Sequence, residues 1–169
     1  RKSASMMARV LQEAKWPGQL EHPSIVPVYE LGTRKDGQLY YTMKLVRGKT
    51  LSKALRECKT LQDRLSLLSN FVDLCQAIAY AHSRGVIHRD IKPANVMVGA
   101  FGETVVLDWG LAKGRDVPDI YGKELESTIR NLQLKVKDRP KPDVTPFETR
   151  VGEAVGTPGY MSPEQAEGR

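Results

Sequence analysis

The apolar residues of this chain follow a helical spacing most clearly between residues 61 and 83. They recur there at steps of three and four residues, which places them on one stripe of a helix: Leu61, Leu65, Leu68, Val72, Cys75 and Ile78. Such a stripe is typical of an amphipathic helix that faces a core. Gly85 is a typical residue just beyond a helix end. The pattern predicts one long helix over 61–83, buried along this stripe.

Two shorter helices are expected before it. Residues 5–15 are typical of a helix, and Pro17 disfavours a helical conformation at the residue before it, so this helix is expected to end early. Thr50 can cap a helix that runs to about Cys58, because its hydroxyl accepts hydrogen bonds from unpaired backbone N–H groups.

Apolar runs too short for helices predict two β-hairpins. The first pairs residues 25–32 with 39–46 across an Asp-Gly dipeptide at 36–37, which is a typical hairpin signal. The second pairs residues 96–98 with 104–107. Both hairpins are antiparallel, so each places the start of one strand beside the end of the other.

The second hairpin brings two polar side chains together. Asn95 precedes its first strand and Asp108 follows its second strand, and neighbouring strands lie about 4.8 Å apart. Both residues offer oxygen atoms, and a few hard oxygen ligands suit a Mg²⁺ ion that also binds the phosphates of a substrate. The spacing predicts a Mg²⁺ site at the open end of this hairpin.

Composition and charge narrow the function classes. The 169 residues suffice for one domain with a core of its own. The formal net charge is +6, but the charges are scattered, so we expect a solvated surface and no nucleic acid partner. No run approaches the roughly 18 to 20 apolar residues of a membrane span. Cys58 and Cys75 are too few for a disulfide framework. Cys75 is expected to be a buried thiol, and the setting to be cytoplasmic.

One polar octet concentrates reactive groups. Residues 88–95 are His-Arg-Asp-Ile-Lys-Pro-Ala-Asn, and an Asp-Trp-Gly triplet follows at 108–110. Together they resemble the catalytic loop and the metal-binding triplet of protein kinases. Residues 156–166 resemble the substrate-docking segment of the same family, with Ser162 in place of the alanine of an Ala-Pro-Glu triplet. The sequence of this segment is similar to that of bacterial eukaryotic-like (Hanks-type) kinases, and Lys92 favours the serine/threonine branch of the family.

The resemblance implies separate catalytic roles. Asp90 would accept the proton of a substrate hydroxyl, and Lys92 would neutralise charge on the γ-phosphoryl group of ATP. Asn95 and Asp108 would hold Mg²⁺. Thr157 would form hydrogen bonds close to Asp90 and Lys92.

The resemblance also implies nucleotide contacts in the first half of the chain. Glu13 would pair with a strand lysine that orients the ATP phosphates, and Met43 would be the gatekeeper beside adenine. The backbone of Val46 would hydrogen-bond the base, Met97 would form the floor of its pocket, and Lys92 would contact the phosphates. A solvated glutamate and apolar residues of a core strand are the ordinary alternatives for these positions.

A long stretch without periodicity, residues 113–150, has the position of an activation loop. Arg89 resembles the residue that pairs with a phosphate on that loop. We expect the phosphate on Thr145 or Thr149. Trp109 stands where the family usually has phenylalanine, which is expected to alter packing without loss of metal binding.

The expected fold is an incomplete two-lobed protein-kinase fold of the α+β class. Residues 1–46 would be a remnant of the N-lobe, with the C helix and two strands. Residues 47–169 would hold the hinge exit, the first C-lobe helices and the catalytic loop, with the activation segment at 108–164. The sequence begins with Arg1 and contains no glycine-rich loop and no Val-Ala-x-Lys strand. We therefore expect a central fragment that is nearly inactive by itself.

The leading hypothesis is a Mg²⁺-dependent serine/threonine kinase that uses ATP and a protein substrate. The alternative is a pseudokinase or scaffolding module, which has no chemical need of Asp90, Asn95 and Asp108. A basic nucleic-acid-binding domain is disfavoured because no readout motif is present. No membrane segment is expected within this sequence, although an anchor elsewhere is compatible with it.

Overall fold

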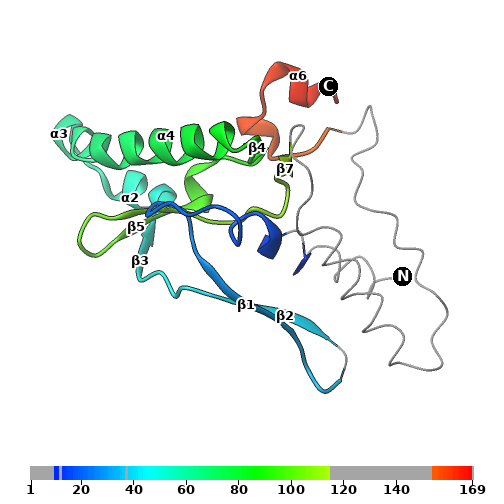
Figure 1. Ribbon diagram of the computed structural model, residues 1–169. Coiled ribbons are helices and arrows are strands. Elements are labelled where there is room, and N and C mark those ends of the chain that lie inside the picture. Colours follow the sequence, from blue (N-terminus) through cyan, green and yellow to red (C-terminus); the bar gives the residue numbers. More distant parts are fainter. Residues whose placement is uncertain (1–9, 12, 37, 115–153, 169) are drawn as a thin grey trace.

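A computed structural model describes residues 10–11, 13–36, 38–114 and 154–168. The first of these ranges and residues 13–15 are helical. The elements that follow, in chain order, are β1 (Val28–Thr33), β2 (Leu39–Met43), β3 (Gly48–Thr50), α2 (Leu51–Glu57), α3 (Leu61–Leu65), α4 (Leu68–Ser83), β4 (Val86–Ile87), η1 (Pro93–Asn95), β5 (Val96–Gly99), β6 (Thr104–Val106), β7 (Lys113–Gly114), η2 (Pro158–Tyr160) and α6 (Pro163–Ala166). Figure 1 shows α4 on one side of β5, and the β1–β2 hairpin extending away on the other.

The β1–β2 hairpin confirms the first strand prediction, with shorter strands. Thr33 faces Leu39 in an antiparallel register. The N–H of Arg34 donates to the carbonyl of Gln38 at 2.8 Å, and the carboxylate of Asp36 accepts from the N–H of Gln38 at 3.0 Å. The predicted strands at 25–32 and 39–46 were each too long at the end away from the turn, because β1 begins at Val28 and β2 ends at Met43.

The second hairpin, β5–β6, is present with the predicted antiparallel pairing, and Val96 lies opposite Val106. It belongs to a three-stranded sheet, in which β3 pairs with the other edge of β5. The strand β3 was not predicted. It is only three residues long, and its Gly48 lies so close to β5 that a Cβ atom there would sit 2.2 Å from the carbonyl oxygen of Val98.

The predicted single helix over 61–83 is wrong, because the structure has two helices there. The N–H of Asp63 donates to the Thr60 hydroxyl at 3.1 Å, and the Asp63 carboxylate accepts from the Thr60 N–H at 2.8 Å, so a capping box starts α3. The Ser66 hydroxyl then donates to the carbonyl of Asp63 at 2.7 Å. Such a local bond competes with the helical ladder, and α4 begins anew at Leu68.

The prediction that the apolar stripe is buried is also wrong. Within the described residues most of the stripe is exposed, namely Leu61, Leu65, Leu68, Val72 and Cys75. The opposite side of α4 is the buried one, with Asn70, Leu74, Ala77 and Ala81. Its two alanines occupy little space, and the polar residue is accommodated because the Asn70 amide donates to Gly102 O and Thr104 Oγ1, each at 2.9 Å. Ile78 alone of the stripe packs partly against the core.

The core lies between α4 and the β5–β6 hairpin and continues to the segment after the first helix. That helix ends at Lys15, as Pro17 predicted, and a turn follows. Ile25 forms a parallel bridge with Val106, whose N–H donates to the carbonyl of Ser24 at 2.8 Å. Within the described residues, fifteen buried apolar side chains form this core, among them Trp16, Leu74, Val96 and Trp109. No helix in the described part of the chain is long and apolar enough to cross a membrane.

Candidate active site

The open end of the β5–β6 hairpin positions the candidate metal ligands. The N–H of Leu107 donates to the carbonyl of Asn95 at 2.8 Å, so Asp108 leaves the hairpin at the end where Asn95 enters it. Asp108 has a φ of 58°, in the left-handed region that non-glycine residues seldom occupy. Its backbone therefore turns sharply away from β6 immediately after the hairpin.

His88 joins the octet to this turn. It is 1% exposed, and its Nδ1 accepts a hydrogen bond from the N–H of Asp90 at 3.2 Å. Its Nε2 lies 3.1 Å from the carbonyl oxygen of Leu107. A carbonyl only accepts, so the proton is on Nε2 and the ring is neutral. Burial lowers the pKa of His88 and favours the same state. The ring also packs on Trp109, with centroids 4.6 Å apart.

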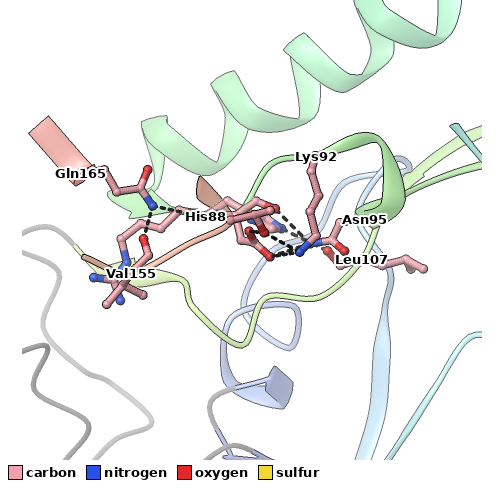
Figure 2. A network of polar contacts seen from close by, with 9 residues as sticks. His88, Lys92, Asn95, Leu107, Val155 and Gln165 are labelled. Atoms are coloured by element: carbon pink, nitrogen blue, oxygen red, sulfur yellow. Dashed lines mark hydrogen bonds and ion pairs between the residues drawn. The ribbon is translucent and has the colours of Figure 1, made fainter. Parts of the chain in front are cut away.

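Asp90 bonds with the side chains of Lys92, Asn95 and Thr157. Figure 2 shows Lys92 and Asn95 in this network. Asp90 is 7% exposed. Lys92 Nζ lies 2.7 Å from its Oδ2, and the Thr157 hydroxyl donates to its Oδ1 at 2.6 Å. Lys92 Nζ also donates to Thr157 Oγ1 at 2.7 Å. Thr157 is thus brought to its predicted neighbours Asp90 and Lys92, although more than sixty residues separate it from either.

The network sets the charge of Asp90. Burial alone would raise the pKa of Asp90, but hydrogen bonds from Lys92 and Thr157, the charge of Lys92 and a bond from Asn95 together hold that pKa below its usual value. Asp90 is therefore a carboxylate at neutral pH, with both oxygens already in hydrogen bonds. A carboxylate in this state can accept a hydrogen bond from an incoming hydroxyl and orient it.

The orientation of Asn95 fits the binding of a cation by its oxygen. Its Nδ2 donates to the backbone carbonyl and to Oδ2 of Asp90, both at 3.0 Å. The amide hydrogens are thereby directed to Asp90, and the amide oxygen is the atom left for a ligand. Within the described residues no group of three or more His, Cys, Asp or Glu could hold a metal ion. Two oxygen donors, Asn95 and Asp108, suit Mg²⁺ that keeps waters and phosphates as its other ligands.

Of the residues predicted to contact the nucleotide, Glu13 and Met43 lie at a hollow, whereas Met97 lies against the core. Glu13 and Met43 line one small hollow together with Asp108 and Trp109. Met97 is only partly buried and packs against the core. The Tyr41 hydroxyl, whose role was not predicted, donates to Glu13 Oε2 at 3.0 Å. Glu13 lies next to the Asp-Trp-Gly triplet, because a Cβ atom on Gly110 would be 2.9 Å from Glu13 Cγ.

Val46 and Arg89 lie in two different connecting segments. Val46 packs partly against the core in the connection between β2 and β3. Arg89 has a φ of 65°, and its Nε donates to the carbonyl of Leu111 at 2.6 Å. It therefore lies beside the start of the predicted activation segment. Thr145 and Thr149, the predicted phosphorylation sites, lie outside the described residues.

One residue that the sequence reasoning missed is Gln165. Its amide nitrogen donates to the carbonyls of Arg89 and Val155 (Figure 2). The Ser162 hydroxyl accepts from the Gln165 N–H at 3.3 Å and caps α6. The serine in place of alanine in the docking segment could have indicated this cap. No local pattern predicts the contact with Arg89, because 76 residues separate the two.

A buried carboxylate paired with a lysine, next to a hairpin with Asn and Asp at its open end, is the arrangement that protein kinases use for phosphoryl transfer. The protein kinase domain family matches residues 1–169, and the chain belongs to this family. The predicted α+β kinase-like fold is confirmed.

Proteins with similar sequences are named as serine/threonine-protein kinases. The chain is 41% identical to the serine/threonine-protein kinase PknD of Protochlamydia amoebophila, over 95% of this chain and 16% of that protein. It is 35% identical to PknD of Chlamydia caviae, over 95% of the chain and 17% of the relative, and 36% identical to PknD of Chlamydia trachomatis serovar D, over 98% and 18%. The chain thus spans less than a fifth of the length of these relatives. The predicted membership among bacterial eukaryotic-like kinases is confirmed.

Proposed function

We propose that this chain is part of a serine/threonine kinase that transfers the γ-phosphoryl group of ATP to a hydroxyl of a protein substrate. The observation that carries the proposal is the network in which Lys92, Thr157 and Asn95 all contact the buried Asp90 carboxylate. Burying a carboxylate is costly unless it is paired, and here three side chains are used to pair it. A scaffolding protein has no chemical need of such a buried charge.

Each side chain of the network has a proposed task. Asp90 accepts a hydrogen bond from the substrate hydroxyl and takes its proton as the phosphoryl group is transferred. Lys92 neutralises charge that gathers on the transferred group. Thr157 holds one Asp90 oxygen, so that the carboxylate keeps one orientation. These tasks rest on positioning and charge, which is what phosphoryl transfer requires of a protein.

Asn95 and Asp108 are the proposed ligands of Mg²⁺, which when bound neutralises charge on the ATP phosphates. The support is the orientation of the Asn95 amide, whose hydrogens are directed to Asp90. For the nucleotide we propose contacts from Met43, Val46 and Met97 around the adenine. Glu13 would anchor a lysine of a neighbouring strand.

The division of the chain and its regulation are also proposals. Residues 1–46 would belong to the N-lobe and 47–169 to the C-lobe, with the activation segment at 108–164. Arg89 would bind a phosphate on Thr145 or Thr149. Because these 169 residues contain no glycine-rich loop and no strand lysine, we propose that they transfer little phosphate by themselves. The kinase domain would act in the cytoplasm, where ATP is available.

The test is Asp90→Asn in the full-length protein, with Asp36→Asn in the exposed β1–β2 turn as the matched control. Phosphate transfer from ATP to dephosphorylated casein is expected to fall at least about a hundredfold in the first variant and to stay unchanged in the second. Binding of a fluorescent ATP analogue should persist in both. Wild-type activity in Asp90→Asn would refute the assignment of the base.

The same measurements address the alternative. A pseudokinase would bind the nucleotide analogue but transfer no phosphate in the wild-type protein, at any Mg²⁺ concentration. That result would overturn the enzymatic proposal and leave the scaffolding function.

A further inference from the structure

The placement of Thr157 requires an explanation beyond its own hydrogen bonds. Residues 154–168 carry Thr157 to Asp90, and none of them is buried. Apolar packing therefore does little to fix this segment, and polar contacts must decide its position. Besides Thr157, the side chain of Gln165 also contacts residues 88–95, through the carbonyl of Arg89.

Gln165 joins the two chain segments that meet at Asp90. Its Nε2 donates one hydrogen bond to the carbonyl of Arg89 and another to the carbonyl of Val155. An amide NH₂ group has two hydrogens, so this single nitrogen is fully used. Arg89 immediately precedes Asp90, and Val155 is two residues before Thr157. The amide thus fixes the backbone next to the carboxylate and next to the hydroxyl that contacts it.

Gly156 shows how close this approach is. Its φ of 136° lies in the region that favours glycine. A Cβ atom there would lie 2.5 Å from Gln165 Nε2 and 2.9 Å from the carbonyl oxygen of Arg89. Any side chain at this position would displace the amide from its two acceptors. The glycine therefore makes room for the contact through which Gln165 acts.

We propose that Gln165 is a positioning residue, which sets Thr157 against Asp90 and Lys92 by holding the backbone of both segments. The inference rests on the proposed kinase function and adds to it. Gln165 touches no reacting atom, so its effect should pass through Thr157. It should change the rate of transfer and leave the binding of ATP alone.

The substitution Gln165→Glu in the full-length protein isolates this role. A glutamate has the same shape but, when ionised, no hydrogen to donate, and it would face two carbonyl oxygens. We expect kcat for casein to fall by about ten- to a hundredfold, the loss of two hydrogen bonds. KM for ATP should stay within about twofold. Gln76→Glu, on the exposed side of α4, adds the same charge and should leave both values unchanged.

A double-mutant cycle separates positioning from a general structural effect. Thr157→Val removes the hydroxyl that Gln165 is proposed to place. In that background Gln165→Glu should lower kcat by less than about threefold, because the two substitutions act on one contact. The same loss in both backgrounds would mean that Gln165 acts independently of Thr157, and would overturn the proposal.

Amide hydrogen exchange tests the contact without relying on activity. Backbone amides of residues 155–161 should exchange about tenfold faster or more in Gln165→Glu than in the wild type, and at the wild-type rate in Gln76→Glu. Unchanged exchange in Gln165→Glu would overturn the positioning role. If the wild-type protein transferred no phosphate, the proposed function would fail, and the exchange rates would still decide whether Gln165 holds this segment.

Discussion

Replacing Lys92 with methionine tests how the charge of Asp90 is maintained. Lys92 Nζ lies 2.7 Å from Asp90 Oδ2, and the two side chains are 23% and 7% exposed. Methionine keeps much of the length and removes the charge. Thr157 and Asn95 would remain as donors to Asp90. The carboxylate would then be buried with hydrogen bonds but without a cation.

The direction and size of the effect follow from these contacts. In the wild type the pKa of Asp90 is held below its usual value, so the group stays ionised as the pH falls. Without Lys92 the remaining burial raises that pKa. A hydrogen bond to a charged group is worth about 1.5–3 kcal/mol, and partial exposure of Lys92 favours the lower end. Because the hydrogen bond from Lys92 and its charge both lower the pKa of Asp90, we expect that pKa to be higher in the variant than in the wild type.

The assay is kcat for casein phosphorylation by the full-length protein between pH 5 and 8. At neutral pH the variant should be about a hundredfold slower or more, because charge on the transferred group is no longer neutralised. The ratio of the variant rate to the wild-type rate cancels the titration of ATP itself. This ratio should fall further as the pH decreases toward 5. Lys92→Arg keeps a cation, and its ratio should be independent of pH.

A ratio for Lys92→Met that stays constant from pH 8 to 5 would refute the reasoning. It would mean that Thr157 and Asn95 suffice to keep Asp90 ionised, and that Lys92 acts on the substrate alone.

The remaining predictions concern stability, measured by urea denaturation. Burial lowers the pKa of His88, so the unfolded chain binds a proton that the folded ring does not. The free energy of unfolding should therefore fall as the pH drops below about 6.5. His88→Phe should reduce this fall, and His82→Phe at the exposed end of α4 should not. Asn70→Leu leaves two acceptors on the β5–β6 hairpin without their donor and should cost about 1–3 kcal/mol; a loss near zero would contradict this. A Cβ at Gly110 would lie 2.9 Å from Glu13 Cγ, so Gly110→Ala should destabilise by about 1–3 kcal/mol. Adding Glu13→Ala should restore most of that loss.

The part of the site that could be predicted from the sequence is the part that one hairpin assembles. Strand pairing over 96–107 depends on a short connection between two short apolar runs. It therefore fixes Asn95 beside the start of the Asp-Trp-Gly triplet, whatever the rest of the chain does. The register with Val96 opposite Val106 confirms that step. Asp90 follows from the same logic, since only four residues separate it from Asn95.

Burial of the α3–α4 stripe could not be predicted from periodicity. The spacing of Leu61, Leu65 and Leu68 shows that they share one side of a helix, but not which side meets the hairpin. The structure selects the opposite side because Asn70 hydrogen-bonds Gly102 and Thr104 there. A buried asparagine lowers the apolar signal of the packed face. When a polar residue such as Asn70 lies on the packed face of a helix, the apolar pattern can therefore indicate the opposite, exposed face.

Long-range backbone contacts are the second feature that the sequence does not contain. Trp16 Nε1 donates to the carbonyl of Ala112 at 3.0 Å, although 96 residues separate them. A Cβ at Gly114 would lie 2.6 Å from the Trp16 ring. These contacts attach the end of the first helix to the segment after Asp108. Carbonyl acceptors carry no sequence signature, so only the folded chain reveals them.

Two residues next to the site have a strained backbone, and long-range hydrogen bonds stabilise one of them, Arg89. Arg89 and Asp108 are the non-glycine residues with positive φ in the described part of the chain, and such conformations cost about 1–3 kcal/mol each. They flank the chemistry, one directly before Asp90 and one after the hairpin. The Arg89 side chain donates to Leu111 O, and its carbonyl accepts from Gln165. The start of the predicted activation segment and the residue directly after its end therefore both contact the residue that precedes Asp90. Residues 88–95 can keep their strained conformation because these two segments contact them, and the position of Asp90 is coupled to theirs.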